Sequence, residues 1–328
     1  MSPADLDGWV PAHLYRHQGR MMAEWYRTGS ERFHEPFFEE SVGRLLRYPF
    51  NSLFFKQTPA SVLGELAAHP PAVKPAGFIF HTSRCGSTLV AQMLASSARN
   101  IVISEAPAFD TILRERYAEG GASETDRTQW LQGLMAALGQ RRHSEEDRLF
   151  VKFDSWSIFE LPIIQRAFPA VPWIFLYRNP IEVLVSHMRR RGVQMVPGML
   201  PPEMFGLDRD DAVQMQAEEF CARALRALLE SALRNLGVGH GLLVNYADLP
   251  GSMWSEILAH FGVSWSEIER KSMAAAAQLD AKNPIQAFNP DAATKLSAAG
   301  AQLAIENEKH SLPVYEQLEA VRLAARSK

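Results

Sequence analysis

Cysteine, excess charge and long apolar stretches are all scarce in this sequence. Only two cysteines occur among the 328 residues, Cys85 and Cys221, so neither a disulfide framework nor a cysteine-based zinc site is expected. The formal net charge of −3 argues against broad attraction to nucleic acid or to an anionic membrane. The longest apolar runs are far shorter than the roughly 20 residues that cross a bilayer. The first ten residues lack the basic and then apolar pattern of a signal peptide. The sequence therefore predicts a soluble, cytoplasmic protein with no membrane span and no nucleic-acid partner.

Several catalytic motifs are also missing. No glycine is followed by Lys-Ser or Lys-Thr, so the chain has no Walker A loop and a conventional ATP or GTP hydrolase is disfavoured. No Gly-x-Ser-x-Gly elbow occurs, which argues against a serine hydrolase. The ten histidines do not supply a His-x-x-x-His helix motif with an adjacent carboxylate, so no metal site is predicted.

Hydrophobic patterning divides the chain into three parts. The first 75 residues are predicted to be mostly helical, with one helix around Phe37–Leu46 and another starting at Thr58-Pro59, before a Pro-rich linker at 69–75. Short, unbroken apolar runs then alternate with helical patterns, which is typical of a parallel sheet covered on both faces. The predicted strands are Gly77–Phe80, Ile101–Ile103, Leu149–Val151, Trp173–Tyr177 and Leu242–Val244.

Two longer helices are predicted between these strands. One is opened by Thr125-Asp126, and the other runs from about Asp210 to Leu236 and is closed by Gly237. Residues 192–209 lack a clear period and form either a lid or a solvated connection. The expected fold is α/β, with three layers, a P-loop-like central parallel sheet and helical additions at both ends. The expected boundaries are a helical extension at 1–75 packed on the core, a core at 76–270 and a helical extension at 271–328.

The loop after the first core strand carries the strongest functional signal. A buried strand is followed by a short polar loop with a glycine, a cation and two hydroxyls, and then by a helix. A helix N-terminus offers unpaired N–H groups and a partial positive charge, so this arrangement favours binding of a phosphate group. Without a ligand, the same residues would be a capped helix after a buried strand; the Arg-x-Gly-Ser-Thr cluster favours the functional interpretation.

This segment resembles the loop of sulfotransferases that use 3′-phosphoadenosine 5′-phosphosulfate, in which Pro-Arg/Lys-Ser-Gly-Thr/Ser-Thr grips the 5′-phosphosulfate. Ser83 replaces the usual Pro, and Cys85 replaces the usual Ser, so backbone contacts would survive but a hydroxyl bond from position 85 would not. Cys85 is expected to be a loop residue and not a nucleophile. The resemblance implies that the donor's phosphosulfate is held by Ser83, Arg84, Cys85, Gly86, Ser87, Thr88 and Leu89.

A second motif supports the first. Arg178-Asn179-Pro180 follows a buried strand, with Asn179 as a helix N-cap and Pro180 at the first helical position. The motif resembles the sulfotransferase sequence Arg-Asx-Pro followed by a Ser, which implies that Arg178 and Ser186 hold the 3′-phosphate of the donor. Taken alone, Arg178 could equally pair with a carboxylate. The segments 150–169 and 242–249 also resemble the family, so that the likeness covers about residues 76–263.

Four residues are candidates for the chemistry. Arg84 is the first choice and Lys152 the second for the cation that stabilises the leaving group, since sulfuryl transfer depends on positioning and electrostatics. Glu105 follows the second strand, 19 residues after Gly86. It resembles the base of sulfotransferases that act on protein tyrosines. Asp154 aligns roughly with the His that serves cytosolic sulfotransferases, and is the second choice.

The sequence thus predicts transfer of a sulfuryl group from 3′-phosphoadenosine 5′-phosphosulfate, the co-substrate, to a hydroxyl or amine. The acceptor would be a small molecule, a glycan or a lipid, and a homodimer is possible. No metal is required by the chemistry of the resembled family. One alternative is a small-molecule kinase that lacks the Walker A Lys, and another is a non-catalytic nucleotide-binding or scaffold protein.

Overall fold

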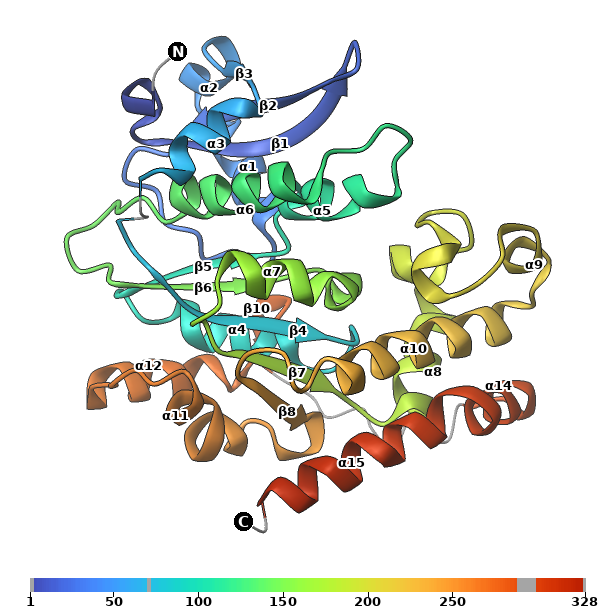
Figure 1. The fold of residues 1–328 in the computed structure, drawn as a ribbon. Helices are drawn as coiled ribbons and strands as arrows, with labels where there is room; N and C mark the ends of the chain where they lie inside the picture. Colours follow the sequence, from blue (N-terminus) through green and yellow to red (C-terminus); the bar gives the residue numbers. More distant parts are fainter. Residues whose placement is uncertain (1–2, 70–71, 288–298, 327–328) are drawn as a thin grey trace.

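The computed structural model describes residues 3–69, 72–287 and 299–326. Its centre is a five-stranded sheet in the order β5-β6-β4-β7-β8, in which every neighbouring pair is parallel (Figure 1). All five strands predicted from the apolar runs are confirmed: one has the predicted bounds, and the other four are longer by two or three residues. They are β4 (Pro75–His81), β5 (Asn100–Ser104), β6 (Arg148–Lys152), β7 (Trp173–Tyr177) and β8 (Gly241–Asn245).

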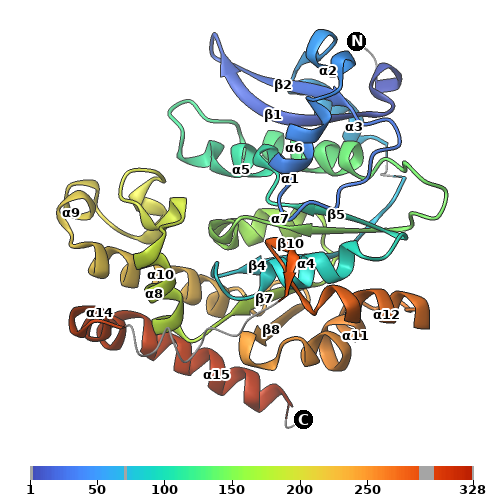
Figure 2. The ribbon, with the colours of Figure 1, turned by 180° about the vertical axis from the view of Figure 1, so that it is seen from behind.

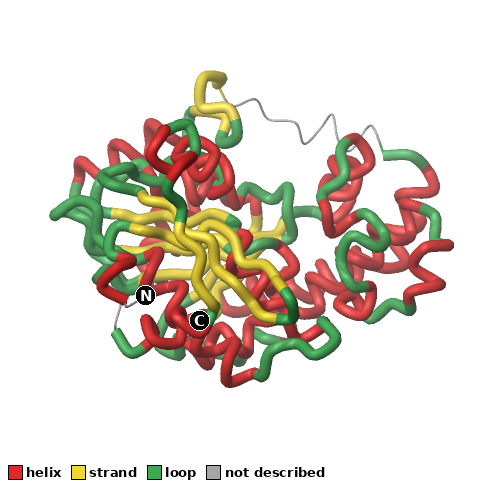
Figure 3. The backbone as a smooth tube through the Cα atoms, turned by 90° about the horizontal axis from the view of Figure 1, so that it is seen from above, coloured by secondary structure: helices red, strands yellow, loops and turns green. Residues whose placement is uncertain are grey.

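Both faces of this sheet are covered, because its strands carry apolar side chains on both sides. One face packs against α4 (Ser87–Ala95), α11 (Leu258–His260) and α12 (Glu267–Ala276). Figure 3 shows the strands in the middle of the molecule with helices on both sides. The other face packs against α5 (Pro107–Arg114), α6 (Glu124–Leu138), α7 (Leu161–Ala167), α8 (Pro180–Arg189), α10 (Ala217–Arg234) and α15 (Leu312–Arg326). The expected three-layer α/β fold is therefore confirmed.

The N-terminal part differs from its prediction, because it is not mostly helical. Its centre is a three-stranded antiparallel sheet, and its β1–β2 hairpin turns at Gln18 and Gly19, which both have positive φ. The two expected helices are present, although the one predicted at Thr58-Pro59 begins only at Ser61, and a third short helix between them was not predicted. The elements are β1 (Trp9–His17), β2 (Arg20–Arg27), β3 (Lys56–Pro59), α1 (Phe38–Leu45), α2 (Pro49–Leu53) and α3 (Ser61–Ala67), preceded by a 3₁₀ turn at Pro3–Leu6.

The N-terminal sheet and α15 lie at opposite ends of the molecule, with the parallel sheet between them (Figures 1 and 2). The predicted helix from Asp210 to Leu236 is wrong in one respect: it is broken at Met215 and Gln216 into α9 (Arg209–Gln214) and α10. Residues 192–209 form two 3₁₀ turns, Val193–Met195 and Pro202–Phe205, within irregular chain.

The C-terminal part is not wholly helical either. After α12, which crosses the boundary predicted at 270/271, a small hairpin is formed by β9 (Leu279–Asp280) and β10 (Asn283–Ala287). Then come α14 (Ala301–Glu306), a π-helical turn at Asn307–Ser311, and α15. The parts of the predicted linker and extensions at 70–71, 288–298 and both termini lie outside the described residues. Across the described chain, every helix is too short or too polar to pass through a bilayer.

Candidate functional site

A cavity of about 760 Å³ opens where the strands of the parallel sheet end. His81 ends β4, Glu105 follows β5, and Asp154 lies just beyond β6. Arg178 follows β7 and Tyr246 follows β8. All five residues line the cavity, so each parallel strand contributes at its carboxyl end. This edge is where open α/β sheets bind ligands.

The loop between β4 and α4 has a strained backbone. Ser83 and Arg84 have positive φ angles of 66° and 52°, in a region that side chains other than glycine seldom occupy. Gly86 has a φ of 84°, and a Cβ placed there would lie 2.7 Å from Leu249 and 2.9 Å from Tyr246. Both the angle and the space therefore require glycine at position 86. Strain of this kind gathers at ligand-binding loops.

Polar groups of this loop face the cavity. Ser87 and Thr88 form the first turn of α4, where backbone N–H groups have no partner within the helix. Arg84 donates to the carbonyl oxygen of Arg190 at 3.0 Å, and no carboxylate in the described chain pairs with it. Cys85 instead is buried, with its thiol donating to the Leu176 carbonyl oxygen at 3.2 Å. The loop thus offers hydroxyls, N–H groups and a cation, while Cys85 fixes it to β7.

A line of buried contacts runs under the loop. The Ser83 amide donates to Nδ1 of His81 at 2.9 Å, and Nε2 of the same ring lies 3.3 Å from Oε1 of Glu105. That oxygen lies 2.8 Å from Nζ of Lys152, whose side chain is 0% exposed. Nζ also lies 3.5 Å from Oγ1 of Thr88. The conformation of the loop is therefore coupled to the Glu105–Lys152 ion pair.

The two candidate carboxylates have opposite electrostatics. Burial alone would raise the pKa of Glu105, but the Lys152 ammonium and the His81 ring outweigh it and hold that pKa well below its usual range. Burial, followed by the charges of Glu105 and Asp110, raises the pKa of Asp154 well above its ordinary value. No other side chain in the described residues hydrogen-bonds or pairs with the Asp154 carboxylate, which also makes no capping hydrogen bond to the 3₁₀ turn Ser155–Glu160 that follows it. Two carboxyls with pKa values pushed apart are typical of an acid–base site.

The second predicted motif lies on the same cavity. Asn179 caps α8 by accepting from the Ile181 amide at 3.3 Å, and Pro180 is its first residue, as expected. Arg178 is buried, pairs with Glu182 four residues on, and lies with its guanidinium 4.0 Å from the ring centre of Tyr246. The carboxylate pairing that the sequence left open is thus present. Arg178 nevertheless lines the cavity together with Ser186.

The structure gathers the candidates that the sequence named. Lys152 and Cys85 lie beneath the cavity wall and do not line it, although Lys152 contacts lining residues through Glu105 and Thr88. The predicted residues that line the cavity are Ser83, Arg84, Gly86, Ser87, Thr88, Leu89, Glu105, Asp154, Arg178 and Ser186.

Sequence reasoning missed lining residues from both flanks. Phe37 precedes α1, and its ring lies 4.8 Å from Nζ of Lys152 and 5.8 Å from Nζ of Lys282 in the β9–β10 hairpin. Burial and the nearby Arg84 and Lys152 lower the pKa of Lys282. Neither residue belongs to a recognisable motif. Only the tertiary structure brings them to the sheet edge.

A further group of residues completes the lining of the cavity. Trp156 donates from Nε1 to Asp110 at 2.6 Å, and Arg114 donates to the other oxygen of that carboxylate at 2.8 Å. Met199 and Leu200, from the irregular segment 192–209, also line the cavity. These residues add aromatic and apolar surface and a hydrogen-bonded carboxylate to the cavity lining. The bias of the segment toward Pro, Gly and Met was its only sequence signal.

Comparisons with known proteins give matches among solved structures. No family model matches the sequence, and no curated protein matches it. The sulfotransferase domain of the Synechococcus PCC 7002 olefin synthase is 17% identical, with a TM-score of 0.41, covering 76% of this chain and 96% of that one. A sulfotransferase from Mycobacterium avium is 11% identical, with a TM-score of 0.42, covering 75% and 79%.

Both of these structures are sulfotransferases. A third, the sulfotransferase domain from the curacin biosynthetic pathway, is 15% identical, has a TM-score of 0.40, and covers 73% of this chain and 98% of its own. This is the family that the two sequence motifs resemble. At these identities and TM-scores, the likeness identifies neither the reaction nor the residues that perform it.

Proposed function

We propose that this protein is a sulfotransferase that takes a sulfuryl group from 3′-phosphoadenosine 5′-phosphosulfate. The observation that carries the proposal is the convergence of the two sequence motifs on one cavity. Arg84, Gly86, Ser87 and Thr88 lie on one side of it, and Arg178 and Ser186 come from a different strand and helix. A donor with phosphate groups at both its 5′ and 3′ positions needs two such anion sites.

The residues present fit this donor. The N-terminus of α4, its two hydroxyls and Arg84 supply donors for the 5′-phosphosulfate. Arg178 and Ser186 supply a cation and a hydroxyl for the 3′-phosphate, and the ring of Tyr246 packs against the guanidinium. When bound, the donor supplies the sulfuryl group and a phosphate leaving group. The cations of the site stabilise the charge that develops on that leaving group.

Lys152 and Arg84 are the cations assigned to this stabilisation. Arg84 has no carboxylate partner in the described chain and lines the cavity, so its charge is available to an anion there. The ammonium group of Lys152 contacts both the Glu105 carboxylate and the Thr88 hydroxyl. We assign Arg84 to direct contact with the phosphosulfate and Lys152 to support from beneath the loop.

For the base, the proposal reverses the order expected from the sequence. Glu105 is held by Lys152 and His81, which stabilise its ionised form and make it a weak proton acceptor. Asp154 lines the cavity without a side-chain partner among the described residues, and burial makes its carboxylate more basic. Asp154 is therefore placed first as the group that removes the acceptor's proton, and Glu105 second, with a positioning role through Lys152.

The proposed acceptor end is formed by Trp156, Met199, Leu200 and Asp110. Trp156, Leu200 and Met199 offer apolar contact, and the Asp110 carboxylate offers a hydrogen-bond acceptor. These groups suit a small, partly apolar acceptor that carries a hydroxyl or an amine.

The proposal is tested by incubating the purified chain with the phosphosulfate donor labelled in its sulfuryl group and a panel of phenols, aminoalcohols, sugars and lipids. We expect label to appear in at least one acceptor and to need no added ATP. Asp154→Asn is expected to lower that turnover at least a hundred-fold, and Glu105→Gln less. Transfer of the γ-phosphoryl group of ATP to the same panel, with no sulfuryl transfer, would favour the kinase alternative instead.

A further inference from the structure

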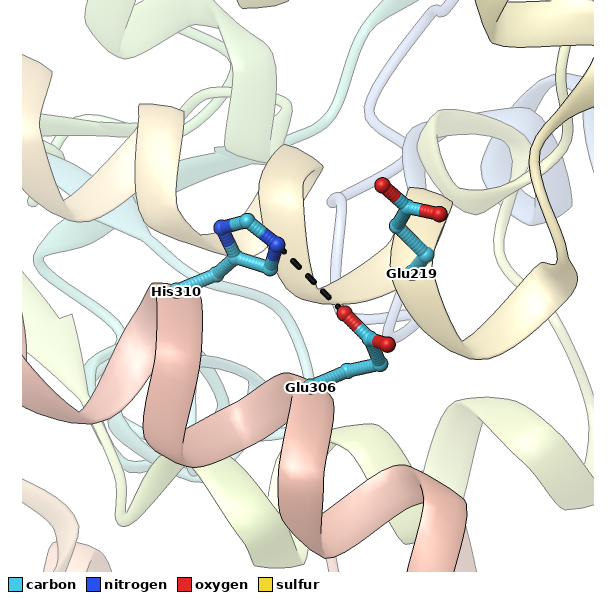
Figure 4. Close-up of side chains that lie close together, drawn as sticks. All are labelled: Glu219, Glu306 and His310. Carbon is cyan, nitrogen blue, oxygen red and sulfur yellow. Dashed lines mark ion pairs between the residues drawn. The ribbon is translucent and has the colours of Figure 1, made fainter.

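A second cluster of ionisable groups lies away from the cavity. Glu219 is in the first turn of α10, Glu306 ends α14, and His310 lies in the π-helical turn Asn307–Ser311. Each offers one ligand atom, and these three atoms lie within 4.8 Å of one another. Figure 4 shows that Glu306 and His310 come from one helical segment and that Glu219 comes from the helix facing it. None of the three lines the cavity.

The polar atoms of this cluster are buried and incompletely bonded. Glu306 is 7% exposed and His310 is 6% exposed. Both ring nitrogens of His310 and Oε2 of Glu306 have no hydrogen-bond partner in the described structure, although Nε2 and Oε2 lie 3.4 Å apart. A buried polar atom without a hydrogen-bond partner destabilises the folded state. One ion can contact Oε2 of Glu306 and one ring nitrogen of His310 at the same time, so these two atoms indicate a shared missing partner.

The surrounding residues direct the free atoms toward one another. Gln302 donates to Oε1 of Glu306 at 2.9 Å, which leaves Oε2 facing His310. Arg223 pairs with Oε1 of Glu219 at 2.7 Å. The π-helical turn displaces His310 from regular helical register, and turns of this type recur at functional sites.

We propose that Glu219, Glu306 and His310 bind one divalent transition-metal ion, with Zn²⁺ as the best fit. Two carboxylates and one imidazole are ligands that zinc accepts. Ligand atoms lie about 2.0–2.2 Å from zinc, so the partly exposed Glu219 side chain must rotate toward the other two. Water would complete the coordination.

The ion would have a structural role. It would join α10, which belongs to the core, to the segment formed by α14 and the π-helical turn. That segment follows the β9–β10 hairpin in the sequence and packs against α10. The proposal does not depend on the sulfotransferase assignment, because it uses none of the residues that line the cavity. A search for His-x-x-x-His could not find this site, because it contains one histidine and because Glu219 lies 87 residues before Glu306 in the sequence.

The test is titration of the metal-stripped full chain with Zn²⁺ in competition with a chromophoric chelator. We expect one equivalent bound, and a loss of affinity of at least ten-fold in both His310→Ala and Glu306→Gln. His13→Ala is the matched control, because His13 also lies near a glutamate, Glu24, but on the N-terminal sheet. It should bind as the wild type does.

Thermal unfolding gives a second readout that needs no activity. Zn²⁺ should raise the melting temperature of the wild type and of His13→Ala, and should leave that of Glu306→Gln unchanged. Glu306→Gln keeps the side-chain size, and circular dichroism establishes that it folds. The proposal is overturned if the wild type binds no zinc at micromolar concentration, if folded Glu306→Gln binds as the wild type does, or if only His13→Ala loses binding.

Discussion

Removing either partner of the Lys152–Glu105 ion pair should destabilise the protein strongly. Lys152→Met leaves Glu105 in its buried setting without its nearest cation, and removal of one partner from a buried ion pair costs about 3–5 kcal/mol. The Glu105 side chain is 22% exposed, so water offsets part of the loss, and we expect about 3 kcal/mol. Glu105→Gln leaves the ammonium of Lys152, which is 0% exposed, without a carboxylate, so its cost should lie nearer 5 kcal/mol.

The double variant separates the interaction energy of the ion pair from the cost of losing each side chain by itself. Lys152→Met with Glu105→Gln leaves no unpaired charge, so it should be more stable than Glu105→Gln alone. The coupling energy from the cycle should exceed about 2 kcal/mol. Free energies of unfolding come from urea titrations followed by circular dichroism and tryptophan fluorescence. Lys271→Met is the control: its pair with Glu267 is about 76% exposed and should contribute less than 1 kcal/mol. Additivity of the two core substitutions within about 0.5 kcal/mol would refute the buried pair.

Three further outcomes are expected. Asp154→Asn should stabilise the chain by about 0.5–2 kcal/mol at pH 8, because a raised pKa means that the folded state opposes ionisation of Asp154. This gain in stability should shrink as the pH falls through the pKa of Asp154 in the folded state toward the ordinary aspartate value. Urea titrations across that pH range measure it, and a gain that stays constant would contradict a desolvated carboxyl. Gly86→Ala should weaken binding of adenosine 3′,5′-bisphosphate at least ten-fold in calorimetry, because the added Cβ would meet Leu249 and Tyr246. Gly43→Ala is the control, since a Cβ there has no atom within 4 Å, and it should bind normally. Equal binding by the two variants would contradict the loop geometry. Arg84→Ala should lower turnover more than donor affinity, and a change confined to KM would make Arg84 a binding residue only.

The core strands were predictable because their residues are buried on both faces. Unbroken apolar runs such as Trp173–Tyr177 have no other simple interpretation in a chain of this composition. The N-terminal hairpin was not predicted, because Pro11 lies inside β1 and the register of the pairing shifts between Pro11 and His13. Alternation of buried residues at Met21, Ala23 and Trp25 in β2 was the available signal.

At the site, local motifs were predictable and their partners were not. The strand–loop–helix at Ser83–Leu89 depends on neighbouring residues, so its features are visible in the sequence. The Glu105–Lys152 pair depends on β5 and β6 being adjacent, with Ser104 opposite Lys152, and on Glu105 taking a positive φ of 54°. Lys282 reaches the cavity from a hairpin far along the chain, and nothing in its own segment indicates this.

The most direct measurement is calorimetric binding of adenosine 3′,5′-bisphosphate and adenosine 5′-phosphate to the wild type and to Arg178→Ala, without added metal. The wild type should bind the 3′,5′-bisphosphate more tightly, because only that nucleotide has a phosphate for Arg178 and Ser186. Loss of one charge-assisted contact costs about 1.5–3 kcal/mol, so Arg178→Ala should weaken the bisphosphate by roughly ten- to a hundred-fold and leave the 5′-phosphate nearly unchanged. Equal weakening of both nucleotides, or a wild type that binds ATP with magnesium more tightly than the bisphosphate, would contradict a donor site for 3′-phosphoadenosine 5′-phosphosulfate.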